Sequence, residues 1–328
     1  MILAGDVGGT KTNVGFFEVR DGKLVSVAEE TFLSDDFPSL EALAQKFVRN
    51  HGRSATLGCF GVAGPVYRGR CKGVNLPWIV DGASLGRALG LKTVHVINDL
   101  ESTAWSLSVL GRRDVVTLGA GIRGASGNAA VIAAGTGLGE GGLYWDGTRH
   151  HPFACEGGHT EFGPRDALES ELLAFLIERY GHASYERILS GEGLADLFRF
   201  FRENNRRKAS ADVVKAIDTA NGPAAVSTAA LENRCPVAVM ALDRFVSIYG
   251  AEAGNLALKL KATGGVFVGG GIAPKIIAKM KEPAFMEAFL DKGRMRELLM
   301  VRVPVRVIMT NRAALLGAAQ FARVNADS

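Results

Sequence analysis

Two glycine-rich stretches decide the fold of this 328-residue chain. They read Gly5-Asp6-Val7-Gly8-Gly9-Thr10-Lys11-Thr12 near the start and Gly135-Thr136-Gly137-Leu138-Gly139 further on. Each comes directly after a short apolar segment, Ile2–Ala4 or Asn128–Ala134, and each leads into another strand-like segment. The pattern predicts a buried strand, a tight glycine turn and a returning strand, present twice in the chain.

The residue types in the two turns are those that bind phosphate. Glycine lets backbone N–H groups approach an anion, since no Cβ is in the way. A carboxylate beside such a turn, here Asp6, can hold Mg²⁺ through water. A plain hairpin turn is the alternative for the first stretch, but a hairpin needs neither the aspartate nor the threonine. The predicted phosphate-binding residues are Gly8, Gly9, Thr10 and Lys11 in the first turn and Gly135, Thr136 and Gly137 in the second.

The second turn also matches a dinucleotide-binding spacing, Gly137-x-Gly139-x-x-Gly142. That fingerprint requires a helix to begin inside it, whereas Leu143–Gly147 reads as a strand and a turn. The match is therefore weak, and the P-loop spacing that ends in Gly-Lys-Ser/Thr is absent from both turns. A phosphate clamp made of strand, glycine turn and strand fits better.

Asn98 and Asp99 follow the apolar strand that is predicted over Thr93–Ile97. Polar side chains at such strand ends open into ligand crevices in α/β sheets. At this place Asp99 is able to deprotonate a hydroxyl and Asn98 to orient it. The alternative is that Asp99 caps a helix over Glu101–Leu110, and the two roles do not exclude each other.

The segment Glu156-Gly157-Gly158-His159 places a carboxylate and an imidazole around two glycines. Such a pair is either half of a metal site or a hydrogen-bonding set for vicinal hydroxyls. Because no cysteine cluster lies beside it, we favour the hydroxyls. Glu186, taken alone, reads as a surface residue of a helix.

Glycines bracket the short strand predicted over Val266–Val268, with Gly264-Gly265 before it and Gly269-Gly270-Gly271 after it. A surface without Cβ atoms suits a base or a ribose lying on the backbone. Close packing of a helix on a strand is an equally good explanation of these glycines.

Charge and cysteine content narrow the function classes. The net charge of +4 is small for this length and argues against nucleic-acid binding. The start of the chain lacks the features of a signal peptide, and glycine or charge interrupts the apolar runs, so we expect a cytoplasmic protein without a membrane segment. The four cysteines are scattered without a Cys-x-x-Cys pair, which predicts buried free thiols and no structural zinc.

Taken in order, these motifs resemble the bacterial glucokinase family, which belongs to the actin-like, hexokinase-like ATPase superfamily. Asn75-Leu76-Pro77-Trp78 resembles the sugar-side loop of that family. Glu186-Arg187-Ile188-Leu189-Ser190-Gly191 resembles one of its sugar-binding motifs. A related repressor and kinase family carries a zinc-binding cysteine cluster that is missing here, so the resemblance is to the group without zinc.

The resemblance implies an α/β protein with the two-domain actin-like (ribonuclease H-like) ATPase fold. In this fold, mixed sheets are flanked by helices and a cleft separates the domains. We expect residues 1–109 plus 310–328 to form a small α/β domain and residues 110–309 a large one. The resemblance also implies a homodimer.

The implied activity is the ATP-dependent phosphorylation of D-glucose at its 6-hydroxyl, with Mg²⁺. Asp99 is expected to be the general base, while Thr10 and Thr136 serve Mg²⁺ and the phosphates with Asp6. The expected sugar-binding residues are Asn75, Asn98, Glu156, His159 and Glu186, and the residues expected to bind the adenosine are Gly269, Gly270 and Gly271.

Three other functions stay open at this point. The first is a kinase for another hexose, such as fructose, mannose or an amino sugar, because the chain departs from the family pattern at Lys11, Glu161 and Glu192. These departures leave the sugar preference and the phosphate donor open. The second is a sugar-sensing regulator without catalysis, and the third is a dehydrogenase, which rests only on the glycine spacing of the second turn.

Overall fold

A computed structural model describes residues 1–73, 76, 78–204 and 209–326. Asn75, which the sequence places in the sugar-side loop, lies outside the described residues. The chain separates into two compact units. Unit 1 comprises Met1–Asp114, Pro152–Ala154 and Thr310–Ser328, and unit 2 comprises Val115–His151 and Cys155–Met309. Whether each unit folds as an independent domain stays a prediction.

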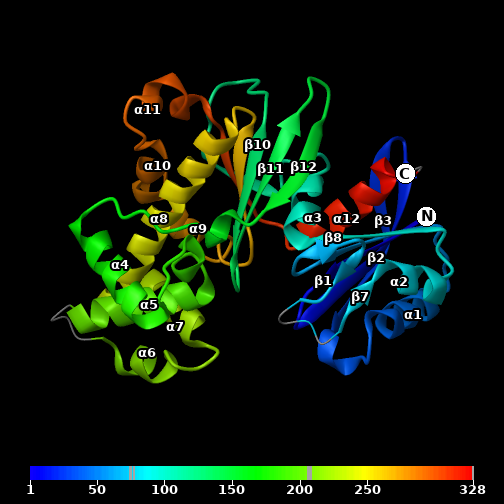
Figure 1. Ribbon diagram of the computed structural model, residues 1–328, viewed down its shortest axis with the longest axis horizontal. Helices are drawn as coiled ribbons and strands as arrows, with labels where there is room; N and C mark the ends of the chain where they lie inside the picture. Colours follow the sequence, from blue (N-terminus) through cyan, green and yellow to red (C-terminus); the bar gives the residue numbers. More distant parts are fainter. Residues whose placement is uncertain (74–75, 77, 205–208, 327–328) are drawn as a thin grey trace. The chain divides into compact units, whose positions relative to one another are not determined.

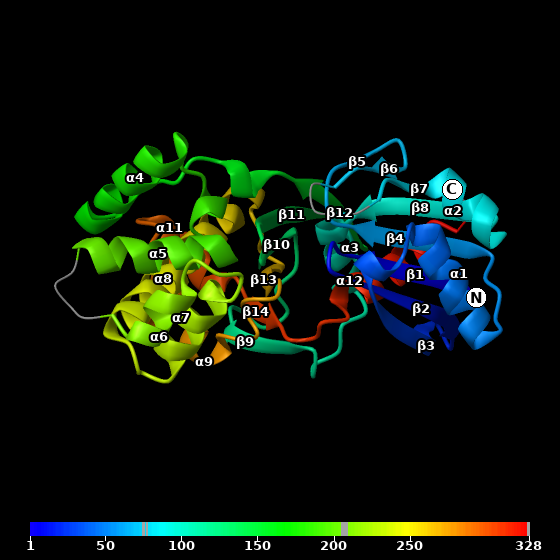
Figure 2. The same cartoon turned by 90° about the horizontal axis from the view of Figure 1, so that it is seen from below.

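Unit 1 is built on a five-stranded sheet. Its first three strands form an antiparallel meander, and two further strands run parallel to the first strand. Asp21 and Gly22 adopt left-handed backbone angles (φ 50° and 73°) and form the tight hairpin between the second and third strands. Figure 2 shows the strands in the order β3-β2-β1-β4-β8. Their bounds are β1 Ile2–Val7, β2 Lys11–Arg20, β3 Lys23–Leu33, β4 Leu57–Val62 and β8 Thr93–Asn98.

Alternate side chains of this sheet pack into two separate cores. Leu3 and Phe16 face the helices α1 and α2, whereas Ile2 and Phe17 face α3 and α12. Figure 1 shows these two pairs of helices on opposite sides of the sheet. The bounds are α1 Leu40–His51, α2 Gly82–Leu89, α3 Asp99–Ser106 and α12 Ala313–Val324, with the short strands β5 Val66–Tyr67, β6 Arg70–Cys71 and β7 Val80–Asp81 and the 3-10 helix η1 Ser34–Asp36 beside them.

Two helix starts follow directly from side-chain capping. Ser39 caps α1 by accepting the N–H of Ala42 at 3.2 Å. The helix α2 begins after the strand β7, because the Asp81 side chain accepts the N–H of Ala83.

The helix α3, which begins at Asp99, is held tightly against α12. Gly317 of α12 faces Ser102 of α3 so closely that a Cβ at position 317 would collide with the Ser102 carbonyl oxygen. The Ser102 hydroxyl also donates to the carbonyl of Ala314 at 2.7 Å. Small residues at this crossing therefore fix the position of the α3 N-terminus.

Unit 2 repeats the strand order of unit 1 and adds one strand at the edge. The order is β12-β11-β10-β13-β14-β9, in which β10 and β11 are antiparallel and β10, β13 and β14 are parallel. The edge strand β9 runs antiparallel to β14. The bounds are β9 Val115–Gly119, β10 Ala129–Ala134, β11 Leu138–Trp145, β12 His150–Cys155, β13 Gly265–Gly269 and β14 Val305–Ile308.

A helical segment between β12 and β13 supplies most of the unit 2 core. The long helix α8 runs over Pro236–Leu260 and is buried along most of its length. The other helices of the unit are α4 Ala167–Tyr180, α5 Gly191–Asn204, α6 Ala211–Ala216, α7 Gly222–Leu231, α9 Ile277–Met280, α10 Pro283–Leu290 and α11 Met295–Leu298, with the 3-10 helices η2 Gly157–His159, η3 Tyr185–Arg187 and η4 Met300–Arg302.

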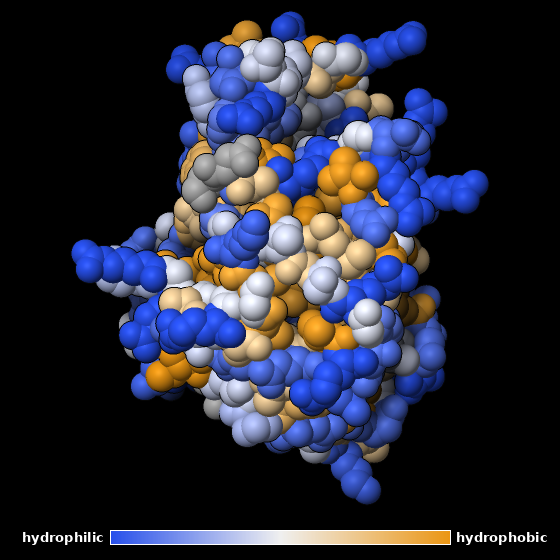
Figure 3. Space-filling model, turned by 90° about the vertical axis from the view of Figure 1, so that its right-hand side faces the viewer, coloured by the Kyte–Doolittle hydropathy of each residue, from blue (hydrophilic) through white to orange (hydrophobic). Residues whose placement is uncertain are grey.

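The structure bears on the expectations of buried free thiols and of no membrane segment. Cys59, Cys71 and Cys235 are buried free thiols as predicted, but Cys155 is exposed, because the second half of β12 faces solvent. Across the residues described, no helix combines the length and apolar character needed to cross a membrane. On the face seen in Figure 3, hydrophilic side chains project around a mixed apolar centre.

Candidate active site

The first glycine turn joins β1 to β2 and leaves its side chains open to solvent. Thr10 and Lys11 are exposed, whereas Asp6 is half-buried at the end of β1. Burial raises the pKa of Asp6, and a hydrogen bond from the Asn13 side chain at 3.1 Å opposes that rise. A desolvated carboxylate with one donor is stabilised by any further cation or donor that approaches it.

Ser34 holds this turn in place, and the sequence analysis missed it. Its hydroxyl donates to the carbonyl of Gly8 at 2.8 Å, and its backbone N–H donates to the carbonyl of Thr10 at 3.0 Å. The buried Thr12 hydroxyl lies 3.0 Å from the same Ser34 oxygen. One serine thus binds both ends of the turn, although it lies in η1 and no local sequence signal marks it.

Strand register brings the first turn and Asp99 to the same edge of the unit 1 sheet. Val7 of β1 pairs with Val62 of β4, and Val62 pairs with Asn98 of β8. These strands are parallel, so their carboxyl ends meet at one edge, where ligands bind in α/β sheets. The predicted phosphate turn and the predicted base are therefore neighbours along this edge.

Asn98, not Asp99, caps the helix α3. Its Oδ1 accepts the N–H groups of Leu100 (2.8 Å) and Glu101 (3.3 Å), while its Nδ2 donates to the carbonyl of Gly64 at 3.1 Å. Asp99 is the first helical residue and is half-buried. The capping role considered for Asp99 is thus wrong, because the residue one position earlier has the extended backbone that a cap requires.

Cys71 lies beneath this corner of unit 1. Burial raises the pKa of the Cys71 thiol, and the Asp99 carboxylate nearby adds to the rise. The thiol also fills the space beside Gly64, whose φ of 138° disfavours any side chain. An uncharged small side chain therefore packs next to the predicted base.

The second glycine turn, between β10 and β11, is closed by backbone bonds. The N–H of Gly135 donates to the carbonyl of Gly137 at 2.8 Å, and the N–H of Gly191 donates to the carbonyl of Gly135 at 2.9 Å. As predicted, a strand and not a helix follows this turn, which removes the structural context of a dinucleotide fingerprint.

Tyr249 of α8 sits beneath the second turn and was not predicted. Its fully buried hydroxyl accepts the N–H of Ala134 at 3.0 Å, and the Gly269 carbonyl lies 3.4 Å away. Ala134 ends β10 just before the glycine turn, and Gly269 ends β13 just before Gly270 and Gly271. One hydroxyl therefore joins the two strand ends that lead into predicted nucleotide-binding segments.

Glu186 connects the second turn to the predicted sugar-binding residues. Its Oε2 accepts the N–H of Leu138 at 3.0 Å, and its Oε1 lies 3.8 Å from Nδ1 of His159. Gly137 leaves room for this carboxylate, since a Cβ there would collide with Oε2. The sequence reading of Glu186 as an ordinary surface helix residue is thus wrong: it lies in η3 and packs on the glycine turn.

Glu156 precedes η2 and His159 is its last residue, and both side chains present polar atoms to solvent. The Glu156 Oε2 lies 3.9 Å from the Nε2 of His159, and their side chains are 74% and 61% exposed. These separations exceed hydrogen-bond length, so both groups can still bind a hydroxyl. Among the described residues no cluster of three or more His, Cys, Asp or Glu is arranged to hold a metal ion.

The two glycines after β13 differ in what a side chain would meet, which bears on whether packing or a ligand explains them. Gly270 has a φ of 82°, and a Cβ there would collide with the Ala134 carbonyl, so it is required for packing. A Cβ on Gly271 would meet no described atom within 4 Å, so this residue presents open backbone. Packing thus accounts for one glycine and leaves the other available to a ligand.

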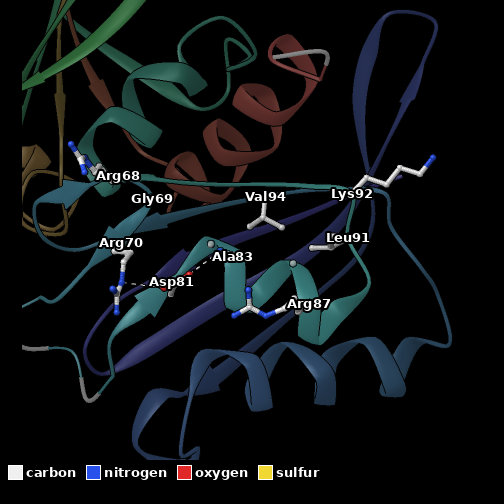
Figure 4. A pocket seen from close by; sticks show the side chains of 11 residues that line it. Arg68, Gly69, Arg70, Asp81, Ala83, Arg87, Leu91, Lys92 and Val94 are labelled. Carbon is white, nitrogen blue, oxygen red and sulfur yellow. Dashed lines mark hydrogen bonds and ion pairs between the residues drawn. The ribbon is translucent and has the colours of Figure 1, made fainter.

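A cavity of about 570 Å³ in unit 1 lies apart from these residues (Figure 4). Its Arg70 is ion-paired with Asp81 at 3.1 Å. Figure 4 shows Arg68 and Lys92 extending in opposite directions, so the positive charges do not converge. No predicted site residue within the described ranges lines this cavity.

Comparison with known proteins identifies the family. The family model described as Glucokinase matches residues 3–325. A glucokinase of Synechocystis sp. is 39% identical over 97% of this chain and 96% of its own, and one of Nostoc sp. is 36% identical over 97% and 98%. The crystal structure of a glucokinase from an Antarctic psychrotroph is 30% identical, with a TM-score of 0.86 and 98% of both chains covered.

These similarities extend over nearly the whole chain and agree with its architecture. The two mixed sheets flanked by helices are those of the two-domain actin-like ATPase fold that the sequence predicted. The reaction is accordingly that of an ATP-dependent hexose kinase acting on glucose. The chain belongs to the glucokinase family.

Proposed function

We propose that Asp99 is the general base that accepts the proton of the glucose 6-hydroxyl during phosphoryl transfer. As the proton leaves, the sugar oxygen forms a bond to the γ-phosphorus of ATP and the bond from that phosphorus to the β-phosphate oxygen breaks. Asp99 stands at the N-terminus of α3, where negative charge is stabilised. Its helix is clamped by α12, which supports a precisely placed base.

The other sugar hydroxyls bind to polar groups that the fold leaves unsaturated. Asn98 is oriented by its bonds to Gly64 and Leu100. Glu156, His159 and Glu186 supply acceptors and a donor that no hydrogen bond between them consumes. A site of this kind rejects a sugar that leaves one of these groups unpaired.

The two glycine turns and the segment Gly269–Gly271 bind ATP in this proposal. Backbone N–H groups of the turns bind the phosphates, and Gly271 offers backbone to the adenosine. The carboxylate oxygens of the half-buried Asp6 and the exposed hydroxyl of Thr10 are hard ligands that fit Mg²⁺ held mainly by phosphate and water. When bound, Mg²⁺ neutralises charge that develops on the phosphates.

The observation that carries the proposal is the double contact of Glu186. Its carboxylate accepts the N–H that follows the second phosphate turn and also lies beside His159. A single side chain therefore ties the geometry of the predicted phosphate site to that of the predicted sugar site. A protein that bound only one of the two ligands has no need of such a link.

Replacing Asp99 tests the assignment of the base. We expect Asp99→Ala to lower kcat by roughly a thousandfold, the range of general-base catalysis, while glucose binding remains measurable by calorimetry. The rate of phosphoryl transfer is measured from the ADP that is released. Asp81→Ala is the matched control, because Asp81 is a true helix cap in the same unit. It should lower stability by about 1 kcal/mol and keep kcat, and an Asp99→Ala enzyme with most of its kcat would contradict the base.

The same assay decides the sugar and the phosphate donor. Glucose should have the highest kcat/KM in a panel with fructose, mannose and an amino sugar, and ATP should exceed ADP and polyphosphate. A higher kcat/KM for another hexose would move the preference within the kinase class. Sugar binding without turnover would favour a sensing role instead.

A further inference from the structure

Two carboxylic acids are buried next to each other in unit 2 without a role in the reaction described above. Glu140 of β11 is 1% exposed, and Glu252 of α8 is fully buried. The Glu252 carboxyl lies close enough to Glu140 to disfavour the ionised form of Glu140. Within the described part of the chain, Oε1 of Glu140 has no hydrogen-bond partner. Such burial is costly for a carboxylate and calls for a specific arrangement of charge.

The hydrogen-bonded ammonium and amide next to the pair both reach Glu252, and neither reaches Oε1 of Glu140. The Lys259 ammonium lies 3.3 Å from Oε1 of Glu252, and the Asn255 side chain donates to Oε2 at 2.7 Å. One ammonium can neutralise one carboxylate, so the second acid is stable when protonated. The O–H of Glu140 then donates to Glu252, which a bond between two carboxyl groups requires.

The pair lies directly beneath the two predicted sugar-binding segments. On one side, a Cβ at Gly157 would collide with the Glu140 carboxyl, and the Cys155 thiol donates to the Glu140 carbonyl at 3.3 Å. On the other side, Asn255 also donates to the hydroxyl of Tyr185 at 3.1 Å. Gly157 belongs to the Glu156–His159 segment, and Tyr185 immediately precedes Glu186.

We propose that Glu140 and Glu252 share one proton and that this protonated pair positions the segments Glu156–His159 and Tyr185–Arg187 for the sugar. Glu140 is then a positioning residue, since it touches Gly157 and not the sugar. The inference rests on the proposed sugar-binding role of Glu156, His159 and Glu186. It adds a buried proton on which that role depends.

The electrostatics of the site set the pH at which the proton leaves. Burial raises the pKa of Glu140 to about 8, the charge of Glu252 adds to the rise, and Lys259 opposes it. The Tyr249 hydroxyl and the Cys155 thiol also interact with Glu140, and loss of solvent together with the Glu140 charge raises the pKa of each. Near the partner acid, Tyr185 and Lys292 interact with Glu252.

Loss of the proton should weaken sugar binding. Two adjacent buried carboxylates repel each other, and the charge lies against Gly157, so the segment above must move or admit water. If only the protonated form holds the sugar segments correctly, the Kd for glucose should rise roughly tenfold between pH 7 and pH 9, as a pKa of about 8 requires.

Calorimetric titration of glucose across this pH range tests the proposal with two variants. Glu140→Gln keeps a neutral donor to Glu252, so its Kd should change less than about twofold between the two pH values. Glu252→Gln removes the charge that helps to raise the Glu140 pKa, so the rise in Kd should move to lower pH. A Kd that rises equally in the wild-type protein and in Glu140→Gln would overturn the positioning role.

Infrared spectroscopy in heavy water tests the proton without any ligand. The wild-type protein should show the carbonyl band of a neutral carboxylic acid at pH 7, and Glu140→Gln should lack it. Absence of the band in the wild-type protein would overturn the shared proton even if glucose binds. Failure of the wild-type protein to bind glucose at any pH would instead contradict the proposed function, and the infrared result would still decide the protonation of the pair.

Discussion

The two sheets follow one plan, but their glycine turns are held in different ways. The turn between β1 and β2 is bound by Ser34, which comes from η1 soon after the same meander. The turn between β10 and β11 is held by Tyr249, Gly191 and Glu186, all from the helical segment that unit 1 lacks. The repeated strand order therefore provides a glycine turn in each sheet, and the surrounding elements decide which residues contact each turn.

This difference explains why the second turn is coupled to the predicted sugar-binding residues. Its supports come from helices that also carry Glu186 and contact the segment after β12. Strand register places the first turn and the predicted base along one sheet edge. Substitutions in the second turn that displace Glu186 should thus affect the sugar, and substitutions near the first turn should affect ATP alone.

Among the tests of this difference between the turns, the largest effect is expected from Gly137→Ala in the second turn. A Cβ at this position would collide with the Glu186 carboxylate, whereas one at Gly135 would meet no described atom within 4 Å. Displacing Glu186 should lower kcat/KM for glucose by about a hundredfold, the cost of misplacing a binding group by about 1 Å. Steady-state kinetics with glucose and ATP varied separately provides the measurement.

Gly135→Ala is the matched control for this substitution. It makes the same chemical change two residues earlier, in open space, and should leave the KM for glucose within about twofold of the wild-type value. Equal losses in the two variants would break the comparison, since the coupling through Glu186 would then be absent.

A smaller effect is expected from Tyr249→Phe. The change leaves the buried N–H of Ala134 without its acceptor, which costs about 1–3 kcal/mol. The KM for ATP should rise several-fold, because the strand ends beneath both nucleotide-binding segments lose their common anchor. Urea unfolding and ATP kinetics measure the two effects.

Tyr180→Phe is the matched control for Tyr249→Phe, because it removes a tyrosine hydroxyl that contacts neither glycine turn. The Tyr180 hydroxyl donates to Asp196 at 2.5 Å, far along the chain from either glycine turn. Its removal should lower stability without raising the KM for ATP. If both tyrosine variants changed that KM alike, Tyr249 would be a structural residue only.

Ser34→Ala should have a milder effect on the first turn. The Gly8 carbonyl loses one donor, but the backbone bond from Ser34 to Thr10 remains. We expect a loss of about 1 kcal/mol and a rise in the KM for ATP with little change in that for glucose. Ser39→Ala, which removes the cap of α1, should cost similar stability and leave both KM values in place. A change in the KM for glucose in Ser34→Ala would contradict the separation of the two turns.

The smallest effect concerns thermal stability and Asp6. Burial raises the pKa of Asp6 in the folded protein, so the folded state holds this proton more tightly than the unfolded state. Its contribution to stability therefore falls as the pH rises above 3.8, the unfolded value. Asp6→Asn removes that cost while its amide oxygen still accepts from Asn13, so its Tm without ligands should exceed that of the wild-type protein at pH 7. The difference in Tm between the two proteins should vanish near pH 3. An equal Tm at pH 7 would show that burial does not destabilise the ionised Asp6 carboxylate.

Local chemistry explains which parts of the fold could be predicted from the sequence. The hairpin at Asp21 and Gly22, the cap at Ser39 and the final helix over Ala313–Val324 all have local sequence signals. Each depends on residues that are neighbours in the chain. The edge strand β9 was missed, because its partner β14 lies at the other end of unit 2 and pairing across such a distance leaves no local pattern.

The same reasoning applies to the candidate site. Asn98 and Asp99 are both good capping residues, so sequence alone did not separate them, and the backbone angles of the folded chain chose Asn98. Ser34, Glu140 and Tyr249 have no motif around them, because a single buried polar residue acquires its role only from its partners. The catalytic and binding roles of the predicted residues stay predictions until the variants are measured.

The sequence by itself determined the two glycine turns and the family, because small residues at fixed spacing permit backbone shapes that few other residues adopt. The tertiary structure alone decided that Glu186 reaches the second turn and that Glu140 meets Glu252 beneath Gly157. Such contacts join residues far apart in the chain, and they exist only after β11, η3 and α8 have packed into one core. Burial then creates the unusual protonation of Glu140, which no pattern of neighbouring residues encodes.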